Sequence, residues 1–167
     1  MSKKLMKTMD GNEAAAYVSY ALTEVATIFP ITPSSPMPEH VDVWASHGMK
    51  NLFGQPVRVM EMQAEAGAIG ALHGVVEAGS LGTSYTASQG LMLMIPVMHR
   101  IAATCKPAVL HVAARSVGSH ALSIFGDHSD VMGCRNTGWG MLCSGSVQEV
   151  MDLAGVAHLS AIKASLP

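Results

Sequence analysis

Short apolar runs alternate along the chain with longer segments in which apolar residues recur at helical spacing. The clearest run, from Pro107 to Ala114, is typical of a strand in a sheet that is buried on both faces. Further runs at 27–29, 57–60 and 81–85 predict three more strands, and residues 140–144 predict another. Because helical segments separate these strands, we expect an α/β domain that is doubly wound around a mostly parallel sheet.

Capping signals mark where several helices begin. Asp10 with Glu13, and Ser146 with Glu149, have the spacing of a capping box. The helices are predicted at 10–22, 36–48 and 64–78, from 88 onward with a kink at Pro96, and at 146–164. Residues 1–9 are then an N-terminal arm, and residues 10–167 are one domain.

The composition predicts a domain that is enclosed by other parts of a larger protein. Hydrophobic residues make up 49% of the chain and charged residues only 13%, whereas about a quarter is usual for charged residues in soluble domains. So few charges cannot cover the surface of a free monomer, so we expect apolar faces at interfaces with other domains or subunits.

The charge pattern excludes several classes of partner. The net charge is −2, and without a basic stripe or aromatic ladder we expect no nucleic-acid binding. The longest apolar run, Leu91 to Met98, is too short to span a bilayer, so no membrane segment is expected. The N-terminus lacks the apolar region of a signal peptide, which favours a cytoplasmic protein.

Two groups of potentially reactive residues are predicted to be packing residues instead. The cysteines lack the spacing of a disulfide framework, a zinc site or a four-cysteine cluster, and we expect them to be reduced: Cys105, Cys134 and Cys143. Three histidines on apolar helices or strands are expected in the core: His73, His111 and His158.

Glu65 is the first candidate for chemistry. It lies between the strand predicted at 57–60 and a helix rich in alanine and glycine, at a junction where α/β ligand crevices open. A carboxyl group there is poorly solvated and can hold or relay a proton. The alternative is a glutamate that caps its own helix, and Glu61 competes for the same role.

Arg115 is the second candidate, because it follows the predicted strand at 107–114 at the same edge. A guanidinium there can hold a substrate carboxylate through two hydrogen bonds. The alternative is a structural salt bridge to Asp127 or Asp130.

One polar segment suggests chemistries that its spacing does not support. His120, Asp127, His128 and Asp130 fit no particular metal geometry, so we expect no metal site. Together with Ser123 they suggest a hydrolase, but the chain has no Gly-x-Ser-x-Gly motif.

Several segments, in one order, resemble a known enzyme family. These are Phe29–Pro36, Glu65 with the alanines and glycines after it, Thr83–Gly90, Val112–Arg115, and further segments at 119–128, 130–135 and 146–152. They resemble the first domain of pyruvate:ferredoxin (flavodoxin) oxidoreductases, which forms the pyrimidine-binding half of a thiamine diphosphate site. The resemblance runs from about Met9 to the last residue, and it implies the thiamine-diphosphate-binding (pyrimidine-domain) fold.

The resemblance implies a role for each candidate residue. Glu65 is the carboxyl group that hydrogen-bonds to the aminopyrimidine of the cofactor. Thr32 and Arg115 form the site for the carboxylate of a 2-oxo acid. Other residues implied in cofactor binding are Pro30, Ser88 and Gln89.

The resemblance also implies a larger enzyme. This enzyme would decarboxylate pyruvate oxidatively to acetyl-coenzyme A and pass electrons to ferredoxin or flavodoxin, as a homodimer in anaerobic metabolism. Mg²⁺ and [4Fe-4S] clusters would lie in other domains, because Gly126-Asp-His128 does not match the Gly-Asp-Gly motif for Mg²⁺ and diphosphate. The family's domain continues beyond Pro167, so we expect a fold that is incomplete at its C-terminus and inactive alone. The alternative is a non-catalytic interaction module or an inactive fragment of the same fold.

Overall fold

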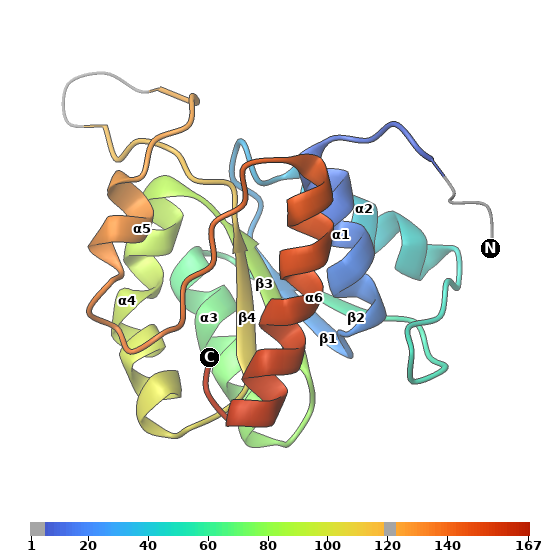
Figure 1. Cartoon of the computed structure of the whole chain (residues 1–167). Helices are drawn as coiled ribbons and strands as arrows, with labels where there is room; N and C mark the ends of the chain where they lie inside the picture. The colour runs from blue at the N-terminus through green and yellow to red at the C-terminus, as the bar shows by residue number, and fades with distance from the viewer. Residues whose placement is uncertain (1–5, 119–122) are drawn as a thin grey trace.

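A four-stranded parallel sheet lies between two layers of helices in the computed structural model, which describes residues 6–118 and 123–167 (Figure 1). The strands are β1 (Val25–Ile28), β2 (Arg58–Glu61), β3 (Gly82–Thr86) and β4 (Ala108–Val112). Their order is β2-β1-β3-β4, with Ala26 opposite Val59 and Ser84 opposite Leu110. The chain therefore moves outward from β1 in one direction and then from β3 in the other. This confirms the doubly wound fold.

One face of the sheet is covered by α1 (Gly11–Ala21), α2 (Pro36–Ser46) and α6 (Val147–Ala164) (Figure 1). Two of these helices begin at the predicted caps. A side-chain oxygen of Asp10 accepts the N–H of Glu13, and Ser146 Oγ accepts the N–H of Glu149. Each such bond satisfies a donor that the first turn of a helix would otherwise leave unpaired.

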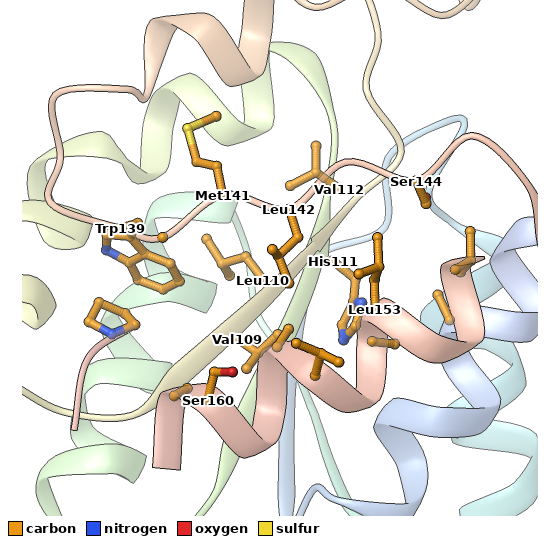
Figure 2. A pocket seen from close by; sticks show the side chains of 18 of the residues that line it. Val109, Leu110, His111, Val112, Trp139, Met141, Leu142, Ser144, Leu153 and Ser160 are labelled. Atoms are coloured by element: carbon orange, nitrogen blue, oxygen red, sulfur yellow. The ribbon is translucent and has the colours of Figure 1, made fainter. Parts of the chain in front are cut away.

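Residues 140–144 form no strand, so that prediction was wrong. The segment instead borders an apolar groove of about 780 Å³ between β4 and α6, and Leu142 lines this groove together with Trp139 and Leu110 (Figure 2). The Gly140 N–H bonds to the carbonyl of Pro167 and not to a neighbouring strand. We call this cavity, lined by β4, α6 and residues 138–144, the β4 groove.

Two histidines join α6 to the sheet. His111 of β4 and His158 of α6 stack with ring centroids 5.4 Å apart, and their Nε2 atoms are 3.2 Å apart. Tyr85, the residue opposite His111 on β3, also stacks with His111. Burial lowers the pKa of His158 to about 4, and burial together with the neighbouring His158 also lowers the pKa of His111. One neutral ring can then donate to the other.

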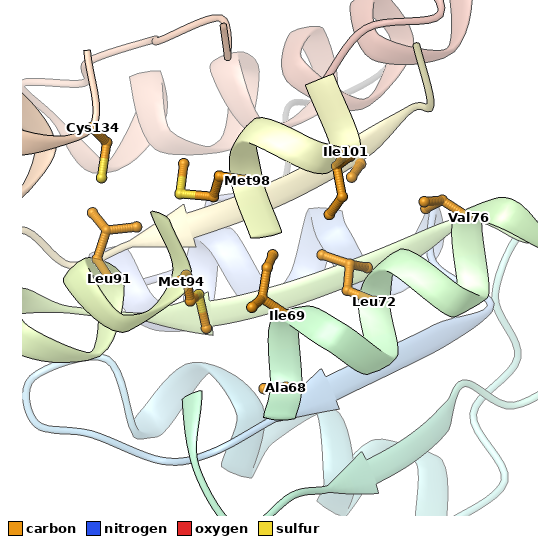
Figure 3. Close-up of a cluster of buried hydrophobic side chains, with 10 residues drawn as sticks. Ala68, Ile69, Leu72, Val76, Leu91, Met94, Met98, Ile101 and Cys134 are labelled. Atoms are coloured by element: carbon orange, nitrogen blue, oxygen red, sulfur yellow. The ribbon is translucent and has the colours of Figure 1, made fainter. Parts of the chain in front are cut away.

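The other face of the sheet is covered by α3 (Glu65–Glu77), α4 (Ser88–Ala103) and α5 (Ser129–Gly133), and α5 was not predicted. Apolar side chains of α3 and α4 point toward one another over β3 (Figure 3). Ile69, Leu72 and Met94 are fully buried there, and burying each such side chain contributes about 1.5–3 kcal/mol. The helix α4 continues through Pro96.

The packing predictions hold for some of the cysteines and histidines. All three cysteines are free, but only Cys134 is buried, whereas Cys105 and Cys143 are exposed. His73 lies half-buried on the surface of α3, where its Nε2 is 3.3 Å from Glu77 Oε1. The core prediction was therefore wrong for Cys105, Cys143 and His73, because an apolar helix or loop still has an outward face. In the part of the chain that the structure describes, no helix is both long and apolar enough to cross a membrane.

Candidate functional site

The predicted site residues converge because each follows a different strand. Thr32 follows β1, Glu65 follows β2, Ser88 and Gln89 follow β3, and Arg115 follows β4. Parallel strands all end at the same edge of the sheet, so these residues share that edge. The strand order also reverses between β1 and β3, and ligands of open α/β sheets bind at such a switch point.

The guanidinium of Arg115 connects three of these segments. Nη1 donates to the carbonyl oxygen of Thr32 at 2.5 Å, and Nη2 donates to Gln89 Oε1 at 2.6 Å. Arg115 is only 6% exposed, and its Nε has no hydrogen-bond partner among the described residues. Both acceptors are neutral, so an anion beside the guanidinium would gain charge-assisted bonds.

Asp130 contacts Arg115 in a different way from the predicted salt bridge. This fully buried carboxylate accepts backbone N–H groups: Oδ2 accepts those of Ser88 and Arg115, each at 2.9 Å, and Oδ1 accepts that of Val131. No ion pair between the Arg115 guanidinium and Asp127 or Asp130 is recorded among the described residues. Sequence reasoning considered Asp130 as an ion-pair partner and within a rejected metal or hydrolase cluster, and it missed the contacts of Asp130 to the backbone.

Ser88 has a buried and unusual conformation at the start of α4. Its φ is 49°, in the left-handed region that few residues other than glycine adopt. Its Oγ lies 2.5 Å from Gln89 Oε1 and 2.7 Å from the carbonyl oxygen of Ser116, and it can donate to one of them at a time. Ser88 is thus more than the helix cap that its position suggests, because it links β3 to the segment after β4.

Glu65 is the first residue of α3 and is 7% exposed. Its carboxylate packs against Gly90 of α4, where an added Cβ would lie 2.7 Å from Glu65 Oε1 and 2.8 Å from Thr86 Oγ1. The buried Thr86 hydroxyl has no hydrogen-bond partner among the described residues. Sequence reasoning missed Thr86 and Gly90. A glycine in the first turn of the helix after β3 is the one signal that could have found this close approach.

The other predicted residues differ in burial. Glu61, the rival of Glu65, lies exposed at the end of the edge strand β2. Thr32 and Pro30 are exposed in the loop after β1. His120 lies outside the described residues. In the ranges 6–118 and 123–167, no group of three or more potential metal-ligating side chains gathers.

Two apolar grooves lie away from these residues. Neither the β4 groove nor a second groove of about 660 Å³ beneath residues 139–144 is lined by any of the predicted site residues. The polar convergence at the edge of the sheet, and not the cavity size, therefore marks the candidate site.

Comparison with known proteins identifies the family. A family model described as "Pyruvate flavodoxin/ferredoxin oxidoreductase, thiamine diP-bdg" matches residues 17–167. The chain belongs to this oxidoreductase family. It is 64% identical over 162 residues to a pyruvate-flavodoxin oxidoreductase of Klebsiella pneumoniae. The aligned region covers 97% of this chain and 14% of that relative.

Other oxidoreductases of the family are also similar. A pyruvate:ferredoxin oxidoreductase of Moorella thermoacetica is 64% identical, over 96% of the chain and 14% of that protein. A mitochondrial pyruvate dehydrogenase [NADP(+)] of Euglena gracilis is 55% identical, over 98% of the chain and 9% of that protein. The chain thus spans about a seventh or less of the length of these relatives.

A solved structure shows the same fold. The 2-oxoglutarate:ferredoxin oxidoreductase of Magnetococcus marinus matches with a TM-score of 0.75 at 20% identity, over 89% of this chain and 26% of that chain. The predicted fold class and the predicted membership of the oxidoreductase family are both confirmed.

Proposed function

We propose that this chain forms the pyrimidine-binding half of a thiamine diphosphate site in a pyruvate:ferredoxin or pyruvate:flavodoxin oxidoreductase. The observation that carries the proposal is the placement of Glu65, a buried carboxylate at the edge of the sheet that packs against Gly90, where an added Cβ would lie 2.7 Å from Glu65 Oε1. The family model, which names thiamine diphosphate, supports the same cofactor.

The residues around Glu65 suit a flat heterocycle with nitrogen donors and acceptors. Glu65 offers a carboxylate, Thr86 offers an unpartnered hydroxyl, and Gly90 allows close approach. Thiamine diphosphate, when bound, supplies the electron sink for decarboxylation of a 2-oxo acid. Glu65 would hydrogen-bond to the aminopyrimidine of the bound cofactor. Gln89 Oε1 accepts a hydrogen bond from Arg115, so Nε2 of the same amide would contact the cofactor.

In this proposal Arg115 and Thr32 hold the carboxylate of pyruvate. The carbonyl of Thr32 anchors the guanidinium, so the exposed side chain of Thr32 keeps its hydroxyl for the substrate. A guanidinium has five N–H donors, and the two that bond to Thr32 and Gln89 leave others free. Burial excludes water and strengthens these bonds to an anion.

The remaining parts of the reaction belong to other domains or subunits in this proposal. They supply Mg²⁺, the [4Fe-4S] clusters, the site for coenzyme A and the docking of ferredoxin or flavodoxin. We place the complete enzyme in the cytoplasm, as a homodimer that makes acetyl-coenzyme A in anaerobic metabolism.

The decisive experiment replaces Glu65 in the assembled oxidoreductase. In E65Q the amide keeps the size of the side chain but cannot hold the proton, so pyruvate-dependent reduction of the acceptor should fall by about 10²–10⁴-fold. The matched control is E61Q, four residues earlier and exposed, which should keep normal activity. Thiamine diphosphate affinity is measured by titration calorimetry in both variants.

Near-normal turnover in E65Q would overturn the assignment of Glu65. If the wild-type assembly binds no thiamine diphosphate at all, the chain is a non-catalytic interaction module or an inactive fragment, and the proposal fails.

A further inference from the structure

Asp130 contacts two residues that lie far apart in the sequence but close together at the edge of the sheet. Asp130 lies on α5, yet its Oδ2 accepts the N–H of Ser88, which follows β3, and the N–H of Arg115, which follows β4. The sequence separations are 42 and 15 residues. One carboxylate oxygen therefore fixes the spacing of two chain segments that both carry candidate site residues.

The carboxylate is fully buried and bonds mainly to backbone. Its Oδ1 accepts the N–H of Val131 at 2.7 Å, so both oxygens have donors. A buried charge with three backbone donors is held in one position, because loss of any bond would leave a desolvated group unpaired. The contact also fixes the left-handed backbone of Ser88.

The segments that Asp130 joins are linked again through side chains. Arg115 Nη2 and Ser88 Oγ both lie within hydrogen-bonding distance of Gln89 Oε1, and Ser88 Oγ also reaches the carbonyl of Ser116. A shift of the Ser88 or Arg115 backbone would thus move Gln89 relative to the guanidinium. Since the Arg115 Nε has no partner among the described residues, few other protein contacts hold the guanidinium in place.

We propose that Asp130 is a positioning residue that aims the Arg115 guanidinium at the substrate by fixing the backbone of Ser88 and Arg115. The inference rests on the proposed role of Arg115 as the partner of a 2-oxo acid carboxylate. Asp130 touches neither substrate nor cofactor. Its effect should be larger on substrate affinity than on cofactor affinity, because Asp130 bonds directly to the backbone of Arg115 and makes no hydrogen bond to Glu65 among the described residues.

The test is D130N in the assembled oxidoreductase. The amide keeps the size of the side chain but has one acceptor oxygen, so at least one backbone N–H loses its partner. We expect the dissociation constant for oxamate, a non-reacting analogue of pyruvate, and the KM for pyruvate to rise about tenfold. The dissociation constant for thiamine diphosphate should rise by a smaller factor than that for oxamate, because Gln89 follows Ser88 and moves with it.

The control is D127N, on the same segment. Asp127 is exposed and one of its oxygens accepts the N–H of Ser129 at 2.6 Å, so D127N removes a carboxylate charge from this segment, keeps an acceptor oxygen for that bond, and does not touch Ser88 or Arg115. Oxamate affinity should change by less than twofold. Equal losses of oxamate affinity in D127N and D130N would show that loss of any carboxylate charge on this segment suffices, and would overturn the inference.

A double-mutant cycle separates this inference from the proposed function. R115K should weaken oxamate binding, and D130N added to R115K should weaken it little further, because Asp130 acts through Arg115. Unchanged oxamate binding in R115K would overturn the proposed role of Arg115. Weakened binding in R115K with wild-type binding in D130N would overturn only the positioning role.

A second variant covers the case in which D130N does not fold. D130E keeps the buried charge but moves the carboxylate outward by one methylene, so it displaces both N–H partners. Weaker oxamate binding with a smaller loss of thiamine diphosphate binding supports positioning. Wild-type affinity for oxamate would show that the charge alone matters, and would overturn the inference.

Discussion

The carboxylate of Glu65 packs against Gly90, and it can lie there because Gly90 has no side chain. Glycine in a helix costs about 1 kcal/mol relative to alanine, yet position 90 lies in the first turn of α4 with the Glu65 carboxylate against it. The lower helix stability that glycine causes is therefore offset by the close approach of the Glu65 carboxylate at the edge of the sheet.

Gly90→Ala tests this contact. An added methyl would lie 2.8 Å from both Glu65 Cγ and Thr86 Oγ1, so the carboxylate must move. Thiamine diphosphate should then bind at least about tenfold more weakly, equivalent to about 1.4 kcal/mol, as measured by titration calorimetry on the assembled enzyme. Unchanged affinity would show that the position of Glu65 is not critical.

Gly70→Ala is the matched control. Gly70 lies on α3 with no atom within 4 Å of an added Cβ. The substitution should leave cofactor affinity unchanged and stabilise the helix by up to about 1 kcal/mol, measured as a higher melting temperature.

Part of the site could be predicted from sequence because it depends on the order of strands. A residue just after a parallel strand must lie at the carboxyl edge, which places Thr32, Glu65 and Arg115 together once the strands are known. The contacts of Gly90 and Asp130 could not be predicted in this way. They depend on how α3, α4 and α5 pack, and short-range patterns do not encode that packing.

At the scale of elements, the attachment of α6 to β4 depends on two histidines that must stay neutral. His111 and His158 are in hydrogen-bonding contact between the two elements, and burial lowers the pKa of both. Tyr85, the titratable side chain stacked on His111, also stays neutral, because burial raises its pKa. Protonation of either ring would place a charge in this contact.

Acid should therefore destabilise the fold through this pair. The folded state holds the pKa of His158 at about 4, below the value of about 6.5 in an unfolded chain. The contribution to stability is present above pH 6.5 and is lost as the pH falls toward 4, by up to about 1.4 kcal/mol per pH unit for each proton that only the unfolded state binds. Urea unfolding of the chain at micromolar concentration, followed by circular dichroism, measures this slope.

The variant H158Q should show a smaller loss of stability between pH 6.5 and 4, because glutamine keeps a hydrogen-bond partner for His111 but does not titrate. H99Q, at an exposed position of α4, should keep the wild-type slope. An identical slope in H158Q and the wild type would contradict the role of the pair.

The elements themselves were predicted well where two signals agreed. Asp10 and Ser146 begin helices as their capping motifs indicate, and the runs near 57–60, 81–85 and 107–114 all became strands. Residues 140–144 had only a short apolar run, and they cover the β4 groove instead of joining the sheet. The five-residue helix α5 is too short to show helical periodicity.

At the scale of the whole molecule, the sheet has an open side. In the part of the chain that the structure describes, β4 pairs only with β3, and the β4 groove runs along its other side. Met141 and Leu142 beside this groove are 46% and 56% exposed. An unpaired strand edge next to apolar side chains favours association with another chain.

The 167-residue chain made alone should therefore self-associate. Size-exclusion chromatography with light scattering should give a mass well above the monomer's 17.5 kDa at high micromolar concentration. L142K places a charge beside the groove and should lower this mass. L52K, at a position that is 71% exposed and does not line the groove, should not. A monomer at all concentrations would show that the β4 edge is sufficiently protected.

The placement of one candidate residue after each strand has a consequence for dividing the chain. A cut between any two strands, for example in the loop before β2, leaves some of Thr32, Glu65, Gln89 and Arg115 on each piece. Neither piece then holds the complete set, and recovery of cofactor binding requires the pieces to re-form their parallel pairing. Ligand binding by the two pieces together would therefore measure whether their strands have paired, so the divided chain would serve as a fragment-complementation assay.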